Sequence, residues 1–207
     1  MAIDKKAIIT YVQLLKEDLA VFRLVPTDGV IPNYEAGQFI TVGMPIPSED
    51  NKIIRRAYSI ASHPENKKFI ELVIRWVRRP LPGRVTTALF NAGEGDEVSW
   101  IPPTGSALKI NEKMGDGSKD QRRIVCIGGG TGIAPFMSFA RHLHDLGDKR
   151  ELVCLHGSSY VDELSYKEEL TALDQESLDR GSNKWNFKYR AAISRPQEWF
   201  NRSWTGQ

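Results

Sequence analysis

The sequence predicts two joined units, an antiparallel six-stranded β-barrel and then a parallel-sheet α/β unit that is incomplete at its C-terminus. Three observations predict this fold class. Short apolar and alternating runs broken by Pro and Gly fill the first half, and a polar stretch at 111–121 interrupts them. Beyond it, apolar strands alternate with helical patterns. We therefore expect the two units at residues 1–115 and 116–207.

Strand patterns in the first half define the expected barrel. The clearest is FIELVIRWV at 69–77, because β-branched and aromatic residues favour strands. The full set of expected strands is 6–15, 20–26, 38–44, 54–61, 69–77 and 96–101, with one helical stretch near 83–92. Six short strands with a single helix favour a closed antiparallel barrel.

The second half has a strand–helix–strand rhythm. Strands are expected at 123–129, 151–157 and 185–193. The first helix carries apolar residues at helical spacing and stops at Gly147, and a second helix is expected from about Asp162 to Leu173. This alternation predicts a parallel sheet covered on both faces. Three strands form a narrow sheet, and no element closes at residues 204–207.

Composition excludes several classes of protein. A hydrophobic fraction of 41% and a charged fraction of 26% are ordinary for a globular protein, and a net charge of +2 is too small to indicate nucleic acid binding. No apolar run approaches the roughly 20 residues that cross a bilayer, and the N-terminus does not resemble a signal peptide. We expect a cytoplasmic monomer with no membrane partner.

The cysteines and histidines argue against a metal site. Cys126 and Cys154 lie inside apolar runs, which favours buried free thiols, and two cysteines cannot hold a four-thiolate iron–sulfur cluster. His142 and His144 are two apart on an expected helix, so their side chains point about 200° apart. No Cys/His spacing indicates zinc, and we expect no metal.

The strongest short motif is Arg56-Ala57-Tyr58-Ser59-Ile60-Ala61-Ser62 on an expected strand. It offers a guanidinium for a phosphate, an aromatic ring and a hydroxyl. Alternation puts Arg56 and Tyr58 on one face of the strand. A cofactor with a diphosphate and a flat ring can use both side chains together. An ordinary strand with a surface Arg and a half-buried Tyr is the alternative interpretation.

A second motif, Gly128-Gly129-Gly130-Thr131-Gly132-Ile133-Ala134-Pro135, follows a strand and opens a helix. Glycines let the backbone approach a pyrophosphate, and the helix N-terminus offers free amide donors. Pro135 suits the first helical turn. The segment is no Walker loop and does not match G-x-G-x-x-G cleanly, and a tight strand-to-helix turn also needs glycine. We expect it to cradle a phosphate.

Together these motifs resemble the ferredoxin–NADP reductase family, in its bacterial flavodoxin/ferredoxin branch. Three further segments agree with the family's order: Tyr34-Glu35-Ala36-Gly37-Gln38-Phe39, Gly83-Arg84-Val85-Thr86 and Pro103-Thr104-Gly105. The resemblance implies an FAD-binding barrel and an NADP-binding α/β domain. It also implies a hydride relay from NADPH through FAD to ferredoxin or flavodoxin, for which Arg75, Arg78, Arg79, Arg84 and Lys109 form a hypothetical docking rim.

The resemblance assigns roles residue by residue. Arg56 pairs with the FAD pyrophosphate, Tyr58 stacks on the flavin, and Ser59 lies near flavin N5, so Tyr58 and Ser59 are the expected catalytic residues. The other expected cofactor contacts are Ala57, Val73 and Arg75, the pyrophosphate turn Gly83, Val85 and Thr86, and the nicotinamide-side residues Gly130, Thr131 and Gly132. Ser194 and Arg195 match a pair that grips the NADP 2′-phosphate, which favours NADPH.

One departure from the family and two rival functions stay open. Relatives carry a further basic residue after the region of Gly206, then more strands, a Cys-Gly motif and a C-terminal segment near the flavin, which this chain lacks. The enzyme alternative is an NADH-linked reductase that serves an oxygenase or resembles cytochrome b5 reductase. The alternative from another class is a non-catalytic flavin-binding module that docks a partner.

Overall fold

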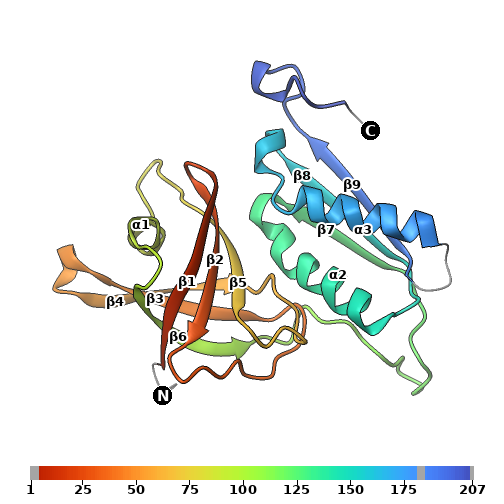
Figure 1. Ribbon diagram of the computed structural model, residues 1–207, viewed down its shortest axis with the longest axis horizontal. Coiled ribbons are helices and arrows are strands. Elements are labelled where there is room, and N and C mark those ends of the chain that lie inside the picture. The colour runs from red at the N-terminus through yellow and green to blue at the C-terminus, as the bar shows by residue number, and fades with distance from the viewer. Residues whose placement is uncertain (1–4, 181–184, 206–207) are drawn as a thin grey trace.

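The computed structural model describes residues 5–180 and 185–205 and contains two sheets that lie side by side (Figure 1). The first sheet has six antiparallel strands in the order β4-β3-β6-β1-β2-β5. Their bounds are β1 Lys5–Lys16, β2 Leu19–Pro26, β3 Phe39–Ile46, β4 Lys52–Ser59, β5 Ile70–Arg75 and β6 Glu97–Thr104. Every expected strand of the first half is present, and helix α1 (Arg84–Asn91) fills the expected helical stretch.

The six-stranded sheet curls around one apolar core. Alternate residues of its strands, among them Phe22, Ile40, Leu72 and Trp100, are almost fully buried in a single cluster. The edge strands β4 and β5 approach each other just past the end of β4, where the Ala61 amide donates to the Glu71 carbonyl at 2.8 Å. The sheet therefore curls as a barrel does. Within the described residues, however, β4 and β5 are not paired along their length, so the barrel is not closed by strand pairing.

Two glycine segments that are far apart in the sequence meet at the open end of β3. Gly37 has a φ of +93°, and a Cβ there would lie 2.3 Å from the Leu108 carbonyl oxygen. The Gln38 side-chain amide donates to the Gly105 carbonyl at 2.9 Å. A side chain at Gly37 would break this close backbone approach, and a Cβ at Gly105 would lie 2.9 Å from the Phe39 ring. The two family-like segments therefore form one structural unit.

The second sheet is parallel, with the order β7-β8-β9. Its strands are β7 Ile124–Gly129, β8 Leu152–Ser158 and β9 Phe187–Ile193, joined by helices α2 (Ala134–Leu146) and α3 (Lys167–Arg180). Cys126, Cys154 and Phe187 face both helices and form a second core. Both cysteines are free and buried, and burial raises the pKa of each thiol to about 12.

The expectation of helices on both faces of this sheet is wrong. α2 and α3 both pack on the face that carries Cys126 and Cys154 (Figure 1). The strand order proceeds in one direction, and right-handed crossovers that step the same way place their helices on the same side. The opposite face leaves Val125 54% and Ile127 73% exposed.

The second helix of this unit begins later than expected. Residues Val161–Glu163 form a 3₁₀ turn rather than the start of α3, and α3 runs on to Arg180. Tyr166, just before α3, has a φ of +62°, which a continuous helix does not allow. Among the described residues no helix is long and apolar enough to cross a membrane. The C-terminal pair 206–207 lies outside the described residues.

Helix α2 joins the two halves. Arg141 donates from Nη1 to Glu71 Oε1 at 2.8 Å and to the Ala61 carbonyl at 2.9 Å. Ser138 Oγ donates to the Ser62 carbonyl at 2.6 Å. A small apolar cluster containing Val73 and Ala134 lies beside these bonds. These contacts form a seam between the halves, in which the segment after β4 and the strand β5 lie against α2.

Candidate functional site

Strand β4 carries the Arg56–Ser59 motif at the edge of the first sheet. Arg56 and Tyr58 pair with Val42 and Ile40 of β3, so they lie on the same face of the strand, as alternation predicts. Arg56 is exposed and donates only locally in the described residues, to the Arg55 carbonyl at 2.8 Å. Its guanidinium is therefore accessible for an anion.

The Tyr58 side chain is half-buried against the barrel core. Its hydroxyl oxygen is buried and has no hydrogen-bond partner among the described residues. Burial raises the pKa of this phenol to about 12, against a smaller opposite effect of Arg56. A buried phenol without a partner is costly, so this is a position where a bound group with an acceptor would be stabilised.

The neighbours of Tyr58 complete the motif. Ala57 is exposed and Ser59 is half-buried, and they pair with Thr41 and Phe39 of β3 on the opposite face from Tyr58. The strand thus presents a guanidinium and an aromatic ring on one face. The Ser59 hydroxyl lies at the end of the strand, next to the segment that enters the seam between the halves.

The N-terminus of α1 forms the second part of the site. Gly83 is the N-cap, and within the described residues no side chain caps the amides of this first turn. Thr86 Oγ1 donates to the Gly83 carbonyl at 2.9 Å. A Cβ at position 83 would lie 2.6 Å from Thr86 Oγ1. Val85 is buried and anchors the helix to the barrel core. The turn leaves its amides free for an anion, and α1 packs against β3 and β4.

Val73 and Arg75 lie on β5. Val73 is buried in the apolar cluster at the seam, where Ala134 of α2 also packs. Arg75 donates from Nη1 to Asp18 at 2.9 Å and to Glu163 of the α/β half at 3.0 Å. The Arg75 side chain therefore connects the two halves. Only the main chain of Arg75 is available for the expected contact with a cofactor.

The glycine turn runs from the end of β7 into α2. Gly130 has a φ of +51°, and a 3₁₀ turn over Gly130–Ile133 leads into the helix. A Cβ at Gly128 would meet backbone atoms of Gly132 and Ile133 at 3.1 Å, whereas one at Gly129 or Gly132 would meet nothing within 4 Å. The first glycine is needed for the tight turn, and the others leave the backbone approachable on its outer side.

A buried histidine lies beneath this turn, a feature that the sequence motif did not reveal. His156 on β8 contacts the Gly130 carbonyl through Nε2 at 3.2 Å and the Tyr189 hydroxyl through Nδ1 at 3.1 Å. Because a carbonyl can only accept, Nε2 carries the proton and Nδ1 accepts from Tyr189. Burial lowers the pKa of His156 to about 4, so the ring is neutral at physiological pH and fixes the carbonyl of the turn.

Ser194 and Arg195 follow the end of β9. The Ser194 amide donates to the Ser158 carbonyl at 2.9 Å and extends the parallel ladder by one residue. Arg195 Nη1 donates to the Tyr160 hydroxyl at 2.6 Å and lies 3.7 Å from Glu198 Oε1. Tyr160 in turn donates to Glu198 at 3.1 Å. The expected phosphate grip thus also includes an aromatic ring and a carboxylate.

The structure brings some predicted residues together and separates others. The β4 motif, β5 and the glycine turn meet at the seam, since β5 contacts the 3₁₀ turn at Gly130–Ile133. The pair Ser194–Arg195 lies beyond the end of β9. The expected basic rim is largely neutralised, because Arg75, Arg78 and Arg84 pair with Glu163, Glu17 and Glu49.

Comparison with known proteins agrees with this architecture. Residues 6–108 match the model of an oxidoreductase FAD-binding domain, and residues 126–204 match that of an oxidoreductase NAD-binding domain. A ferredoxin NADP+ reductase from Neisseria gonorrhoeae, solved with bound FAD and NADP, superposes with a TM-score of 0.74. It is 20% identical, and the match covers 97% of this chain and 72% of that one.

Two curated relatives are longer than this chain. The reductase component of propane 2-monooxygenase from Mycolicibacterium goodii is 26% identical over 198 residues, which cover 94% of this chain and 50% of the relative. One component of the Na(+)-translocating NADH-quinone reductase from Pseudomonas aeruginosa is 31% identical over 169 residues, which cover 77% of this chain and 36% of the relative. The chain thus spans half or less of the length of these two relatives.

Proposed function

Because this chain belongs to the ferredoxin–NADP reductase family of FAD-dependent oxidoreductases, we propose that it moves electrons from NADPH through bound FAD to a one-electron carrier protein. The observation that carries this proposal is the buried Tyr58 hydroxyl, which has no hydrogen-bond partner in the described part of the chain, beside an exposed Arg56 on the same strand face. An aromatic ring and a guanidinium in this arrangement fit the two ends of a flavin nucleotide.

The residues of the first half fit FAD. Tyr58 would lie against the flavin ring, and Ser59 would face its reactive edge. Arg56 would bind the pyrophosphate together with the uncapped amides at Val85 and Thr86, where Gly83 keeps the approach open. Ala57, Val73 and Arg75 would contact the cofactor mainly through their backbone.

The glycine turn is the proposed site for the nicotinamide nucleotide. Gly130, Thr131 and Gly132 would line the pyrophosphate path, since a backbone without Cβ atoms can approach a phosphate closely. His156 holds the Gly130 carbonyl in place from below. When bound, FAD supplies hydride acceptance and single-electron release. The chain would orient both nucleotides across the seam.

We propose NADPH as the donor because Arg195 offers a guanidinium and Ser194 a hydroxyl at one strand end. Arg–phosphate contacts are charge-assisted and frequently bidentate. NADH is a second candidate, and one observation favours it. The Glu198 carboxylate lies within hydrogen-bond distance of Tyr160 in the same cluster, and a carboxylate prefers a ribose diol to a phosphate.

The electron acceptor is proposed to be a small one-electron protein, ferredoxin or flavodoxin. One relative is named as a reductase component of a monooxygenase, which supports delivery to a protein partner and makes an oxygenase the competing destination. Buried free thiols at Cys126 and Cys154 support a cytoplasmic location, where thiols stay reduced.

Steady-state reduction of cytochrome c, with and without added ferredoxin or flavodoxin, tests this proposal. We expect NADPH to support turnover and a carrier to accelerate it. Saturation at lower concentration by NADH than by NADPH would favour the NADH-linked alternative. Bound FAD that neither nucleotide reduces would favour the non-catalytic flavin-binding module.

A further inference from the structure

A cluster of two histidines and two carboxylates lies on the seam between the halves, far from the glycine turn. His63 and Glu65 belong to the segment between β4 and β5, and His142 and Asp145 to the last turns of α2. Asp145 is separated from the start of α2 by on the order of 16 Å along the helix axis. The cluster is therefore distinct from the proposed nucleotide site, and its chemistry does not depend on the proposed function.

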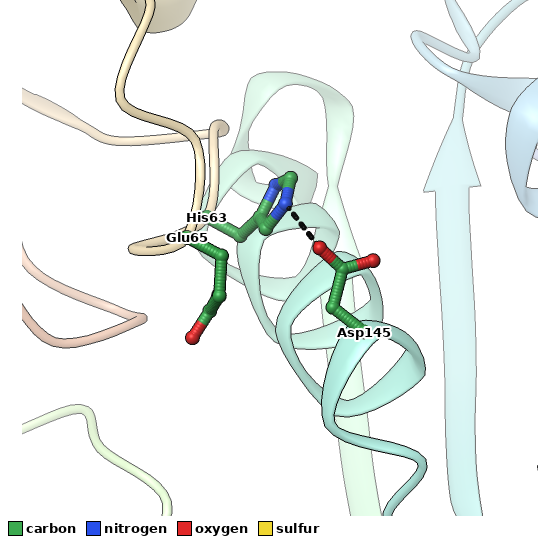
Figure 2. A group of neighbouring side chains, drawn as sticks. All are labelled: His63, Glu65 and Asp145. Atoms are coloured by element: carbon green, nitrogen blue, oxygen red, sulfur yellow. Dashed lines mark hydrogen bonds and ion pairs between the residues drawn. The ribbon is translucent and has the colours of Figure 1, made fainter.

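Each half contributes one imidazole and one carboxylate. His63 Nε2 donates to Asp145 Oδ2 at 2.9 Å (Figure 2), and His142 Nδ1 donates to Glu65 Oε1 at 2.8 Å. His142 and Asp145 are three residues apart on α2, so they share one side of the helix. Both pairs therefore cross the seam, one with its histidine in the first half and the other with its histidine on α2.

Three of these side chains also converge as potential ligands. One nitrogen of His63 and one carboxylate oxygen each of Glu65 and Asp145 all lie within 4.8 Å of one another. Ligand atoms around a tetrahedral zinc ion lie about 3.3 Å apart, because the metal–ligand distances are about 2.0–2.2 Å. Glu65 is 34% exposed, so rotation of its side chain can close the remaining distance.

We propose that His63, Glu65 and Asp145 bind a zinc-type divalent cation, with His142 as the partner that orients Glu65. Imidazole and carboxylate donors suit zinc among the common divalent metals. Zinc replaces the proton that His63 Nε2 shares with Asp145, and that proton leaves to solvent. Water fills the fourth position on the open side of the site.

The surroundings of His63 prepare it for this role. Its side chain is 19% exposed and its Nδ1 is buried, so Nε2 is the nitrogen that faces the cluster. A hydrogen bond from His142 to Glu65 is the kind of outer contact that fixes a ligating carboxylate. The ion would then fasten the β4–β5 segment to the C-terminal end of α2, at the opposite end of the seam from Ala134.

Isothermal titration of the chelator-treated full chain with ZnCl₂ tests this proposal directly. The variants are His63→Gln, Asp145→Asn and, as a matched control, Asp179→Asn. Asp179 lies on α3, where it accepts from the Gln175 side-chain amide at 2.8 Å. Thermal unfolding of each variant with and without zinc provides a second readout that is independent of enzymatic activity.

We expect one zinc ion per chain and a rise in unfolding temperature of about 3–6 °C for each tenfold increase in zinc above the dissociation constant. His63→Gln and Asp145→Asn should each weaken binding at least tenfold, and Asp179→Asn should change it less than twofold. Two results would overturn the site. One is the absence of saturable binding in the wild type, and the other is equal affinity in wild type and His63→Gln.

Discussion

Arg141 of α2 donates to the buried carboxylate of Glu71 on β5 at 2.8 Å, and this pair joins the two sheets. The Glu71 side chain is 2% exposed and also accepts from Arg23 at 2.8 Å. Burial favours the neutral form of Glu71, but the two guanidiniums hold its pKa below the usual value. Within the α/β half, Arg141 also makes a bidentate contact to Glu169 of α3, at 2.7 Å for both bonds.

The first prediction concerns this pair. Arg141→Ala should lower the free energy of unfolding by about 3 kcal/mol, because it leaves a buried carboxylate with only one of its two guanidiniums. Urea denaturation measures the change. Lys6→Ala, which breaks an exposed pair with Glu97, should cost less than about 1 kcal/mol. Equal losses in the two variants would mean that Arg141 does not hold the halves together.

The second prediction concerns Tyr58. Tyr58→Ala should weaken FAD binding about 100-fold and Tyr58→Phe about tenfold, since the first removes the ring and the second removes only the hydroxyl, which has no partner within residues 5–180 and 185–205. Quenching of FAD fluorescence measures both affinities. Tyr11→Ala, at a tyrosine of β1 that contacts Arg23, serves as control and should leave the affinity within twofold. An unchanged affinity in Tyr58→Ala would remove this residue from the flavin site.

The third prediction concerns the choice of donor. Arg195→Ala should raise the KM for NADPH at least tenfold and leave that for NADH within twofold, because only NADPH carries the 2′-phosphate. Arg190→Ala is the matched control, since Arg190 lies on β9 and pairs with Asp174. If Glu198 instead binds the ribose diol of NADH, Glu198→Gln should raise the KM for NADH and Arg195→Ala should affect both donors equally.

The fourth prediction follows from the lowered pKa of His156, about 4 against an ordinary 6.5. The unfolded chain takes up this proton at higher pH than the folded chain, so the stabilisation is complete above pH 6.5 and is lost on acidification toward pH 4. Between pH 7.5 and pH 5 the loss should be about 2 kcal/mol. Urea denaturation at both pH values should show a smaller loss in His156→Gln, and equal losses would contradict a buried neutral imidazole.

Much of the fold follows from local sequence. Period-two alternation located all six strands of the first sheet within a few residues, because turn formers bound each of them. Strand–helix contrast located β7 to β9 equally well. The start of α3 was missed because Tyr166 adopts a positive φ, which helical periodicity does not reveal. The sequence did not predict that both helices cover the same face of the parallel sheet. This arrangement depends on strand order, which is set by long-range contacts.

The site residues likewise divide into those that a local motif predicts and those that only the fold brings together. Sequence motifs found Arg56, Tyr58 and the glycine turn, since each chemical requirement is met within a few consecutive residues. The sequence assigned no role to His156, because its partners Gly130 and Tyr189 are 26 and 33 residues away. The pairing of His63 with Asp145 spans 82 residues. Spacing along the chain compares only histidines and cysteines that are close in sequence, so it does not reveal ligands that the seam brings together.

The most direct test of the account is the visible spectrum of the purified chain before and after addition of NADPH without oxygen. Convergence of Arg56 and Tyr58 on one flavin nucleotide, with the glycine turn opposite, predicts a yellow protein with one FAD per chain that NADPH bleaches. A colourless protein that does not take up FAD would contradict the central claim, as would bound FAD that stays yellow with both NADPH and NADH.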